Sequence, residues 1–412
     1  MSPPKPSPLL PQVVIVGGGV IGCSIAWHLA TRAIARVTLV EKERIGAGTT
    51  WHSAGNITWR PLPHHDDCIL YAFETIERLE RETGQPTGWL RTGRLFLSRS
   101  ARVTGILEKY DKAARERGLA GRFISPKEAA GLNPLIDPAA LAAAWLNPHG
   151  GRLNPADHSA AYVKGARQAG ATIIEGRAVT GLLGRSGRVT GVATAAGNIA
   201  ADHVVVAGGL WSRQLLVGAG VTLAQWPCEH FYVIADVTPR LARQTPSFVA
   251  PDHNLYGREE VGGFLVGVFD DDARPLDPAR LPEPFAFALL EPAWEKIDPY
   301  FQKAVEMFPV LRTAPIRKFI NGPETFTPDG LPLVGAIPGQ AGLLVATAMN
   351  SVGVTWSFAI GHGLADLIAG APPRFDLTPY APDRFGAKAA DETWLQAQAS
   401  DAVGASYRRA NQ

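Results

Sequence analysis

Apolar residues near the start of the chain form two unbroken runs with a helical pattern between them. The run from Val13 to Val16 is typical of a strand buried on both faces of a parallel sheet, and a second run covers Val37 to Val40. Between positions 25 and 30 the apolar residues recur at helical spacing. The pattern therefore predicts a strand–helix–strand unit, which is the start of an α/β fold.

Three glycines stand where the first strand meets the helix, in the pattern G-x-G-x-x-G. Gly17 permits the tight turn, Gly19 lets a pyrophosphate approach the backbone, and Gly22 lets helix and strand pack closely. Glu41 ends the second run 19 positions after Gly22 (41 − 22), close to the roughly 20 expected before an acid that binds a ribose. The unit predicts a dinucleotide site at the N-terminus of a helix, where N–H groups bind phosphates. The alternative is a glycine turn that only packs.

The sequence after Glu41 favours FAD over NAD. A NAD-dependent dehydrogenase would continue with regular βαβ repeats, whereas this chain continues with "KERIGAGTTWHSAGN". A buried strand pattern returns at 204–207 and ends in Gly208 and Gly209, after a hairpin predicted about Ser186 and Gly187. A strand with this small-residue end is typical of the segment beside the cofactor in FAD oxidoreductases.

Apolar patterns in the rest of the chain predict a second, mixed sheet. Its strands are expected at "GRLFLS", "EHFYVIADV", "SFVAPDHNLYGREEVGGFLVGVFD" and "IRKFING". The proline-rich stretch 270–285 is expected to be a loop or lid above a helix at "AWEKIDPYFQKAVEMFPVL". A strand at "LLVATA" is followed by a helical pattern that begins near Gly353.

Composition narrows the class of protein. The chain has 412 residues, 46% hydrophobic and 19% charged, which suggests two or three lobes. Its net charge of +2 and the lack of a basic run make nucleic acid and anionic membrane poor partners. The three scattered cysteines indicate neither a disulfide framework nor a metal site, and fit a reduced, cytoplasmic setting. No apolar stretch reaches the roughly 18 residues of a membrane span, and residues 1–11 are expected to be a disordered lead-in without a signal peptide.

The chain resembles the FAD-dependent amine oxidoreductases of the D-amino-acid-oxidase class, within them the sarcosine and dimethylglycine dehydrogenase branch. The matching stretches extend from about residue 12 to about residue 386. They include "VVIVGGGVIGCSIAWHLA", "GTTWHSAG", "NPHGGRLNPADHSAAYVKGARQAGA", "CEHFYVI", "NGPETFTPDGLPLVG" and "FDLTPYAPDRFG". The resemblance implies a Rossmann-type FAD-binding domain, interleaved with a mixed-sheet substrate domain.

That fold implies domain boundaries and a set of cofactor contacts. The FAD-binding domain is expected to comprise 12–85, 146–222 and 325–386, the substrate domain 86–145 and 223–324, and a helical tail 387–412. The residues expected to bind FAD are Gly17, Gly19, Val20, Ile21, Gly22, Glu41, Lys42, Gly48, Thr49, Thr50, His52, Ala54, Gly55, Val179, Ala207, Gly208, Trp211, Ser351, Val352, Gly353, Val354 and Thr355. The turn at 350–355 is expected to aim helix N–H groups at the flavin edge where charge gathers on reduction.

His52 has a special expected role. In that branch the histidine of a W-H-x-A-G stretch is joined through a ring nitrogen to the 8α-methyl of the flavin, and His52 matches it; the alternative is a histidine that only stacks or hydrogen-bonds. Two departures stand out. The chain ends soon after "PDRFG", so a folate-binding region is not expected, and Glu324 stands where oxidase relatives often carry an arginine.

The resemblance also implies residues and partners on the substrate side. His230 and Tyr256 match catalytic positions, with an interior histidine and a core tyrosine as alternatives, and Trp59 and Arg60 could face a substrate carboxylate. The implied reaction is oxidation of a small secondary or tertiary amine, with oxygen or an electron-transfer flavoprotein as electron acceptor and no metal. Alternatives are an oxidase of a cyclic or D-configured imino acid, and a flavin-bearing subunit of a heteromeric dehydrogenase. The sequence leaves homo-oligomerisation open.

Overall fold

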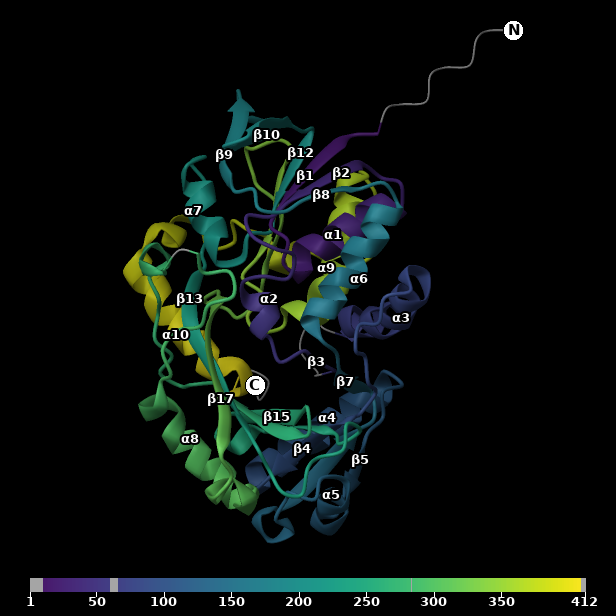
Figure 1. Ribbon diagram of the computed structural model, residues 1–412, viewed down its shortest axis with the longest axis vertical. Coiled ribbons are helices and arrows are strands. Elements are labelled where there is room, and N and C mark those ends of the chain that lie inside the picture. Colours follow the sequence, from purple (N-terminus) through teal and green to yellow (C-terminus); the bar gives the residue numbers. More distant parts are fainter. Residues whose placement is uncertain (1–9, 60–65, 283, 409–412) are drawn as a thin grey trace, which may run out of the picture.

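The computed structural model describes residues 10–59, 66–282 and 284–408, and it contains two large sheets (Figure 1). The first has six strands in the order β18-β19-β12-β1-β2-β8. These strands are β18 (Leu333–Ala336), β19 (Leu343–Thr347), β12 (His203–Val206), β1 (Gln12–Val16), β2 (Arg36–Val40) and β8 (Thr172–Ile174). All neighbours are parallel except β18 and β19. The central strands are the apolar runs predicted from the sequence.

Side chains of β1 alternate between two cores, as the period of two in a strand requires. Val13 and Ile15 belong to the main core, which lies against helices, whereas Val14 and Val16 face the opposite core. That second core is completed by α7 (Ser212–Val217) and by a three-stranded sheet. The three strands are β9 (Val179–Arg185), β10 (Arg188–Thr194) and β11 (Gly197–Ala200), and β9 and β10 form the predicted hairpin about residues 186 and 187.

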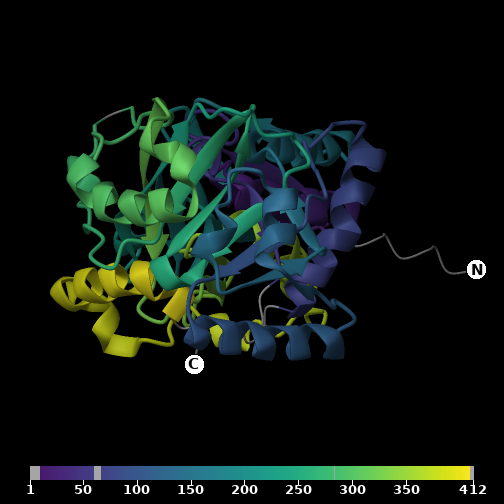
Figure 2. The ribbon, with the colours of Figure 1, turned by 90° about the horizontal axis from the view of Figure 1, so that it is seen from below.

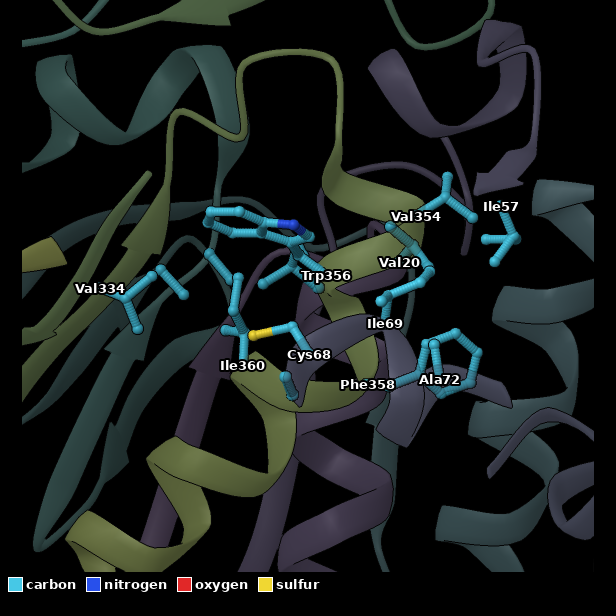
Figure 3. Packing of buried hydrophobic residues seen from close by; sticks show 14 of the residues in the cluster. Val20, Ile57, Cys68, Ile69, Ala72, Val334, Val354, Trp356, Phe358 and Ile360 are labelled. Atoms are coloured by element: carbon cyan, nitrogen blue, oxygen red, sulfur yellow. The ribbon is translucent and has the colours of Figure 1, made fainter. Parts of the chain in front are cut away.

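Helix α1 (Val20–Thr31) is the centre of the main core. It packs between α6 (Pro155–Gln168) and α9 (Gly353–Ile368), and α3 (Asp66–Thr83) lies against these two. Every residue from 20 to 30 is buried, as expected for a helix that is apolar on all sides. Figure 3 shows Val20 beside Val354, Ile69 and Ile57, so four separate chain segments meet at the start of α1.

The second sheet has eight strands, in the order β17-β13-β16-β15-β14-β4-β6-β5. Its strands are β17 (Ile316–Phe326), β13 (Trp226–Ala235), β16 (Gly263–Val268), β15 (Leu255–Glu260), β14 (Ser247–Ala250), β4 (Arg94–Ser98), β6 (Ala143–Asn147) and β5 (Arg122–Ile124). Strand β6 crosses the expected boundary at 145/146, and β17 crosses the one at 324/325. Segments far apart in sequence therefore share this sheet.

The two faces of the second sheet have different neighbours. On β13, Phe231 and Val233 point into a core completed by α8 (Trp294–Met307). Tyr232 and Ile234 point to the other side, into the main core that continues toward the first sheet. This alternation decides which side chains of the second sheet reach the space between the two sheets.

The remaining elements connect or cover the sheets. They are α2 (Thr49–His52), β3 (Asn56–Thr58), α4 (Ala101–Glu116), α5 (Pro126–Leu132), β7 (Gly150–Arg152) and α10 (Glu392–Arg408). The C-terminal helix α10 packs along β13 and β17, and Figure 1 shows it beside these long strands. In the view from below, the yellow C-terminal segment lies along one side of the molecule (Figure 2). Among the described helices, none is long and apolar enough to cross a membrane.

Candidate active site

The glycine turn between β1 and α1 needs its glycines for two different reasons. Gly17 has φ +111°, and a Cβ there would lie 2.4 Å from the carbonyl oxygen of Ala207, the residue that follows the neighbouring strand β12. A Cβ on Gly22 would lie 1.9 Å from the carbonyl oxygen of Gly17, so this glycine permits the close approach of helix and turn. At Gly19 the nearest neighbour would be the Thr50 hydroxyl at 3.2 Å, which leaves this backbone open.

This turn forms one wall of a large cavity, whose space free of atoms is about 1320 Å³ with its mouth included. Glu41 lies in the wall, where its carboxylate accepts hydrogen bonds from the N–H groups of Gly18 (2.6 Å) and Glu43 (2.8 Å). Burial raises the pKa of Glu41, and these two hydrogen bonds oppose the shift. The ammonium group of Lys42 stacks over the Trp211 ring at 3.7 Å from its centroid.

Most of the residues predicted to bind the cofactor line this larger cavity. They are Gly17, Gly19, Val20, Ile21, Glu41, Lys42, Gly48, Thr49, Thr50, Val179, Ala207, Gly208, Trp211, Ser351, Gly353 and Val354. Ala54, Gly55, Val352 and Thr355 line a smaller adjoining cavity instead, of about 640 Å³. Gly22 and His52 are not among the residues that border either cavity.

The turn between β19 and α9 is strained where it meets both cavities. Ala348, Asn350 and Ser351 have left-handed φ values of 55°, 48° and 64°, which cost energy for residues with a side chain. The Asn350 side chain holds this turn, because its Oδ1 accepts from the Thr327 N–H (3.0 Å) and its Nδ2 donates to the Ala348 carbonyl (2.6 Å). The turn thereby places the N-terminus of α9 at the junction of the cavities.

The smaller cavity holds the two residues predicted to be catalytic. His230 on β13 and Tyr256 on β15 both line it, and the His230 Nε2 lies 2.9 Å from the Tyr256 hydroxyl. Their rings are parallel, with an angle of 2° between the planes. His230 is buried, and its Nδ1 has no hydrogen-bond partner among the described residues. Nε2 is thus engaged, whereas Nδ1 is a buried nitrogen without a hydrogen-bond partner in the described part of the chain.

The loop that carries His52 is anchored to the second sheet. The Tyr232 hydroxyl donates to the His52 carbonyl (3.1 Å), and the Arg258 Nε donates to the Ala54 carbonyl (2.7 Å). Both anchors are buried and lie on the sheet face that borders the cavities. The position of this loop therefore depends on the second sheet, although its sequence neighbours belong to the first.

The His52 ring packs over Gly322 of β17. A Cβ on Gly322 would lie 2.6 Å from both the Cε1 and the Nε2 of His52, so only glycine leaves room for the imidazole. Burial lowers the pKa of His52 to about 4; the negative charge of Glu324 opposes the shift, and His230 adds to it. The ring is therefore neutral near pH 7.

Arg94 is a site residue that the sequence prediction did not include, and Glu324 was noted only as a departure from the oxidase relatives. Glu324 lines both cavities and accepts a hydrogen bond from the Ser351 hydroxyl. Arg94, at the start of β4, lines the smaller cavity and is 5% exposed. A charged residue at the start of the apolar strand "RLFLS" is a signal that could have found it.

Of the two residues predicted to face a substrate carboxylate, the structure describes only Trp59. Trp59 is completely buried in the main core, and it is not among the described residues that line the two cavities. Arg60 lies outside the described residues.

The chain matches a known protein family over most of its length. The model of the family described as "FAD dependent oxidoreductase" matches residues 12–367. The chain belongs to this family. Its α/β architecture, predicted from the sequence, is confirmed by its likeness to a solved flavoenzyme structure: glycine oxidase from Geobacillus kaustophilus superposes with a TM-score of 0.76 at 25% identity, covering 91% of this chain and 99% of that one.

Relatives of this chain include enzymes named for N-methyl amino acids. It is 33% identical to "4-methylaminobutanoate oxidase (formaldehyde-forming)" of Paenarthrobacter nicotinovorans, over 98% of this chain and 49% of the relative. It is 30% identical to mitochondrial sarcosine dehydrogenase of Mus musculus, over 98% of this chain and 45% of the relative. The predicted family resemblance is confirmed. The chain spans about half the length of these curated relatives.

Proposed function

We propose that the chain oxidises a small N-methyl or secondary amino acid, of the sarcosine or dimethylglycine kind, with FAD as the first electron acceptor. The observation that carries this proposal is the junction of the two cavities. There the buried pair of His230 and Tyr256 stands in the smaller cavity, next to residues shared with the larger one. The relatives named for 4-methylaminobutanoate and sarcosine support this substrate class.

The larger cavity fits FAD by the chemistry of its walls. The glycine turn and the N-terminus of α1 offer N–H groups for the pyrophosphate, and Glu41 offers carboxylate oxygens for ribose hydroxyls. The N-terminus of α9, held by the strained turn, offers its positive dipole end to the flavin edge. When bound, FAD supplies the acceptor for the hydride that the substrate loses.

His230 is assigned to the substrate proton. An amino acid reaches the site as an ammonium, and it must lose a proton before its nitrogen lone pair can assist loss of a hydride from the adjacent carbon. Nδ1 of His230 accepts that proton, while Nε2 keeps its hydrogen bond to Tyr256. After the oxidation, water adds to the imine and releases an amine and an aldehyde, which is formaldehyde when an N-methyl group is oxidised.

We assign the covalent flavin attachment to His52. For the bond to form, a ring nitrogen with a free lone pair would replace one hydrogen of the flavin 8α-methyl group, with the proton released and the electron pair taken up by the flavin itself, which its electron acceptor would reoxidise. The low pKa of about 4 keeps the ring neutral, so that such a lone pair is available. The anchors at Tyr232 and Arg258 fix the loop. The neighbouring Thr50 and Ser53 line the larger cavity, so the bound flavin would have to reach the ring where it packs over Gly322.

The proposal is tested by anaerobic bleaching of the flavin in the purified FAD-loaded chain. Sarcosine, dimethylglycine and 4-methylaminobutanoate should bleach it faster than proline or D-alanine. His230→Ala should keep its FAD but slow bleaching by roughly 10²–10⁴-fold, the usual loss of a group that handles a proton. His149→Ala, outside both cavities, is the control and should react like the wild type.

Two results would contradict the proposal. Faster bleaching by proline or D-alanine would favour the imino-acid alternative. A chain that holds FAD but is bleached by no amine would favour a flavin-bearing subunit of a larger complex.

A further inference from the structure

The sheet face that borders the smaller cavity carries four polar side chains, which follow one another from strand to strand. Along the sheet from β17 to β4, the cavity-lining side chains are Glu324, then His230, then Tyr256, then Arg94. Alternation along β4 places Leu95 and Leu97 in the core against α8, and thereby puts position 94 on the face toward the cavity. A carboxylate and a guanidinium thus stand at opposite ends of this row.

The two ends differ in their relation to the larger cavity. Glu324 lines both cavities, so it marks the junction where the flavin would be reached. Arg94 lines only the smaller one. Since neighbouring strands are about 4.8 Å apart and four strands separate β17 from β4, the two residues start from well-separated points of the sheet. The cavity therefore has a cationic end away from the flavin.

Arg94 has the properties of an anion-binding residue. Its guanidinium stays charged at every relevant pH and presents a planar fork that fits a carboxylate with two hydrogen bonds. At 5% exposure the group is largely removed from water, which strengthens its attraction for an anion. Of the described residues that line the smaller cavity, Arg94 is the one with a permanent positive charge.

We propose that Arg94 binds the carboxylate of the substrate and so directs the amine toward His230 and the junction at Glu324. This assignment rests on the proposed function, because it names a substrate contact in the same site. It predicts that the enzyme selects amino acids over amines of the same length without a carboxylate. Trp59 and Arg60 were the sequence-based candidates for this contact; Trp59 is not among the residues that line the two cavities, and Arg60 lies outside the described residues.

A binding experiment tests Arg94 without turnover. The FAD-loaded full chain is titrated with butanoate and with butanamide, which differs chiefly in lacking the charge, and binding is followed by flavin absorbance and tryptophan fluorescence. Wild type should bind butanoate more tightly. Arg94→Gln should weaken butanoate binding by roughly 10- to 150-fold, the equivalent of a lost charge-assisted hydrogen bond, and leave butanamide binding unchanged. Arg94→Lys should keep part of the preference.

Arg122→Gln is the matched control, because Arg122 lies in the same sheet but pairs with Glu128 at the surface. It should leave both affinities unchanged. The proposal would be overturned if Arg94→Gln weakened the binding of butanoate and butanamide equally, or weakened neither. It would also be overturned if Arg94→Lys lost the preference for butanoate as completely as Arg94→Gln.

Turnover provides the second test. With the best N-methyl amino acid, Arg94→Gln should raise the concentration for half-maximal flavin bleaching by the same roughly 10- to 150-fold and change the limiting rate much less. Bleaching by N-methylbutylamine should not respond to the variant. If no amine bleaches wild-type flavin, the proposed function fails, and the butanoate titration still decides the role of Arg94.

Discussion

Gly322 shows how a residue without a side chain can determine the chemistry of another residue. It lies opposite His230 in the pairing of β13 with β17, and its bare Cα leaves the space that the His52 ring fills. The identity of position 322 therefore controls where the imidazole stands. The flavin bond proposed for His52 should depend on this glycine as much as on the histidine.

Gly322→Ala should reduce covalent flavin attachment while the chain still binds FAD. The added methyl would lie 2.6 Å from the ring, so the ring must move, and overpacking of this kind costs about 1–3 kcal/mol. Wild-type protein precipitated with acid should keep its yellow colour in the pellet, and the tryptic peptide with His52 should carry the flavin mass. The variant should release most of its flavin under acid, as His52→Ala should.

Gly181→Ala is the control for this prediction, because a Cβ there would meet no atom within 4 Å. It should retain the acid-stable flavin. Wild-type levels of acid-stable flavin in Gly322→Ala would mean that His52 reaches its flavin from another position. Complete release of flavin from the wild type would contradict the bond itself.

At the scale of elements, two glycines at the start of α1 have different roles: Gly19 leaves room for the cofactor, and Gly22 is required for packing. Gly19 has ordinary extended backbone angles (φ −68°, ψ 174°), and a Cβ added there would require only a small shift of the Thr50 hydroxyl, 3.2 Å away. Gly22 is held against the Gly17 carbonyl and has no room for any side chain. The two positions thus test the cofactor and the fold independently.

Gly19→Val should fold but hold little FAD, because its branched side chain would occupy the approach of the pyrophosphate. Gly22→Ala should lose stability, because helix and turn must separate to admit the methyl. Circular dichroism and the ratio of flavin to protein absorbance measure the two effects. Full FAD content in Gly19→Val would contradict the assigned cofactor site, and a wild-type melting temperature in Gly22→Ala would contradict the packing argument.

The sequence predicted those elements whose pattern is local. The strand–helix–strand unit, the hairpin at 186–187 and the helix at Trp294–Met307 follow from periodicity and turn residues within a few positions. Arg94 and Gly322 could not be found in this way. Their roles arise from strands that are neighbours only in the folded sheet, where β17 pairs with β13 and β4 lies four strands farther on.

At the scale of the whole molecule, the fold buries several histidines completely or nearly so. His28, His52 and His158 are each buried, and burial lowers their pKa values to about 3, about 4 and about 3. All three are therefore neutral in the folded chain at pH values where they would be protonated after unfolding. The free energy of unfolding should fall as the pH falls below the unfolded value of 6.5.

The substitution His158→Phe removes the titratable group of one of these histidines. The centroid of the His158 ring lies 4.4 Å from that of Tyr162 and 4.8 Å from that of Phe358. Neither of its nitrogens has a hydrogen-bond partner among the described residues. Phenylalanine removes the titration but keeps an aromatic ring. In the wild type, the unfolded chain binds this proton below pH 6.5, whereas the folded chain does not until about pH 3.

Relative to the wild type, His158→Phe should therefore gain about 2 kcal/mol of stability between about pH 7.5 and about pH 5, whatever constant difference packing adds. Denaturant titrations of the FAD-loaded proteins at several pH values measure this change. Phe358→Leu, which alters packing beside His158 without removing a proton, should differ from the wild type by the same amount at every pH. The stability difference between wild type and His158→Phe could instead stay the same at every pH. His158 would then be protonated in the folded chain as readily as in the unfolded one, which would mean that this part of the core admits water.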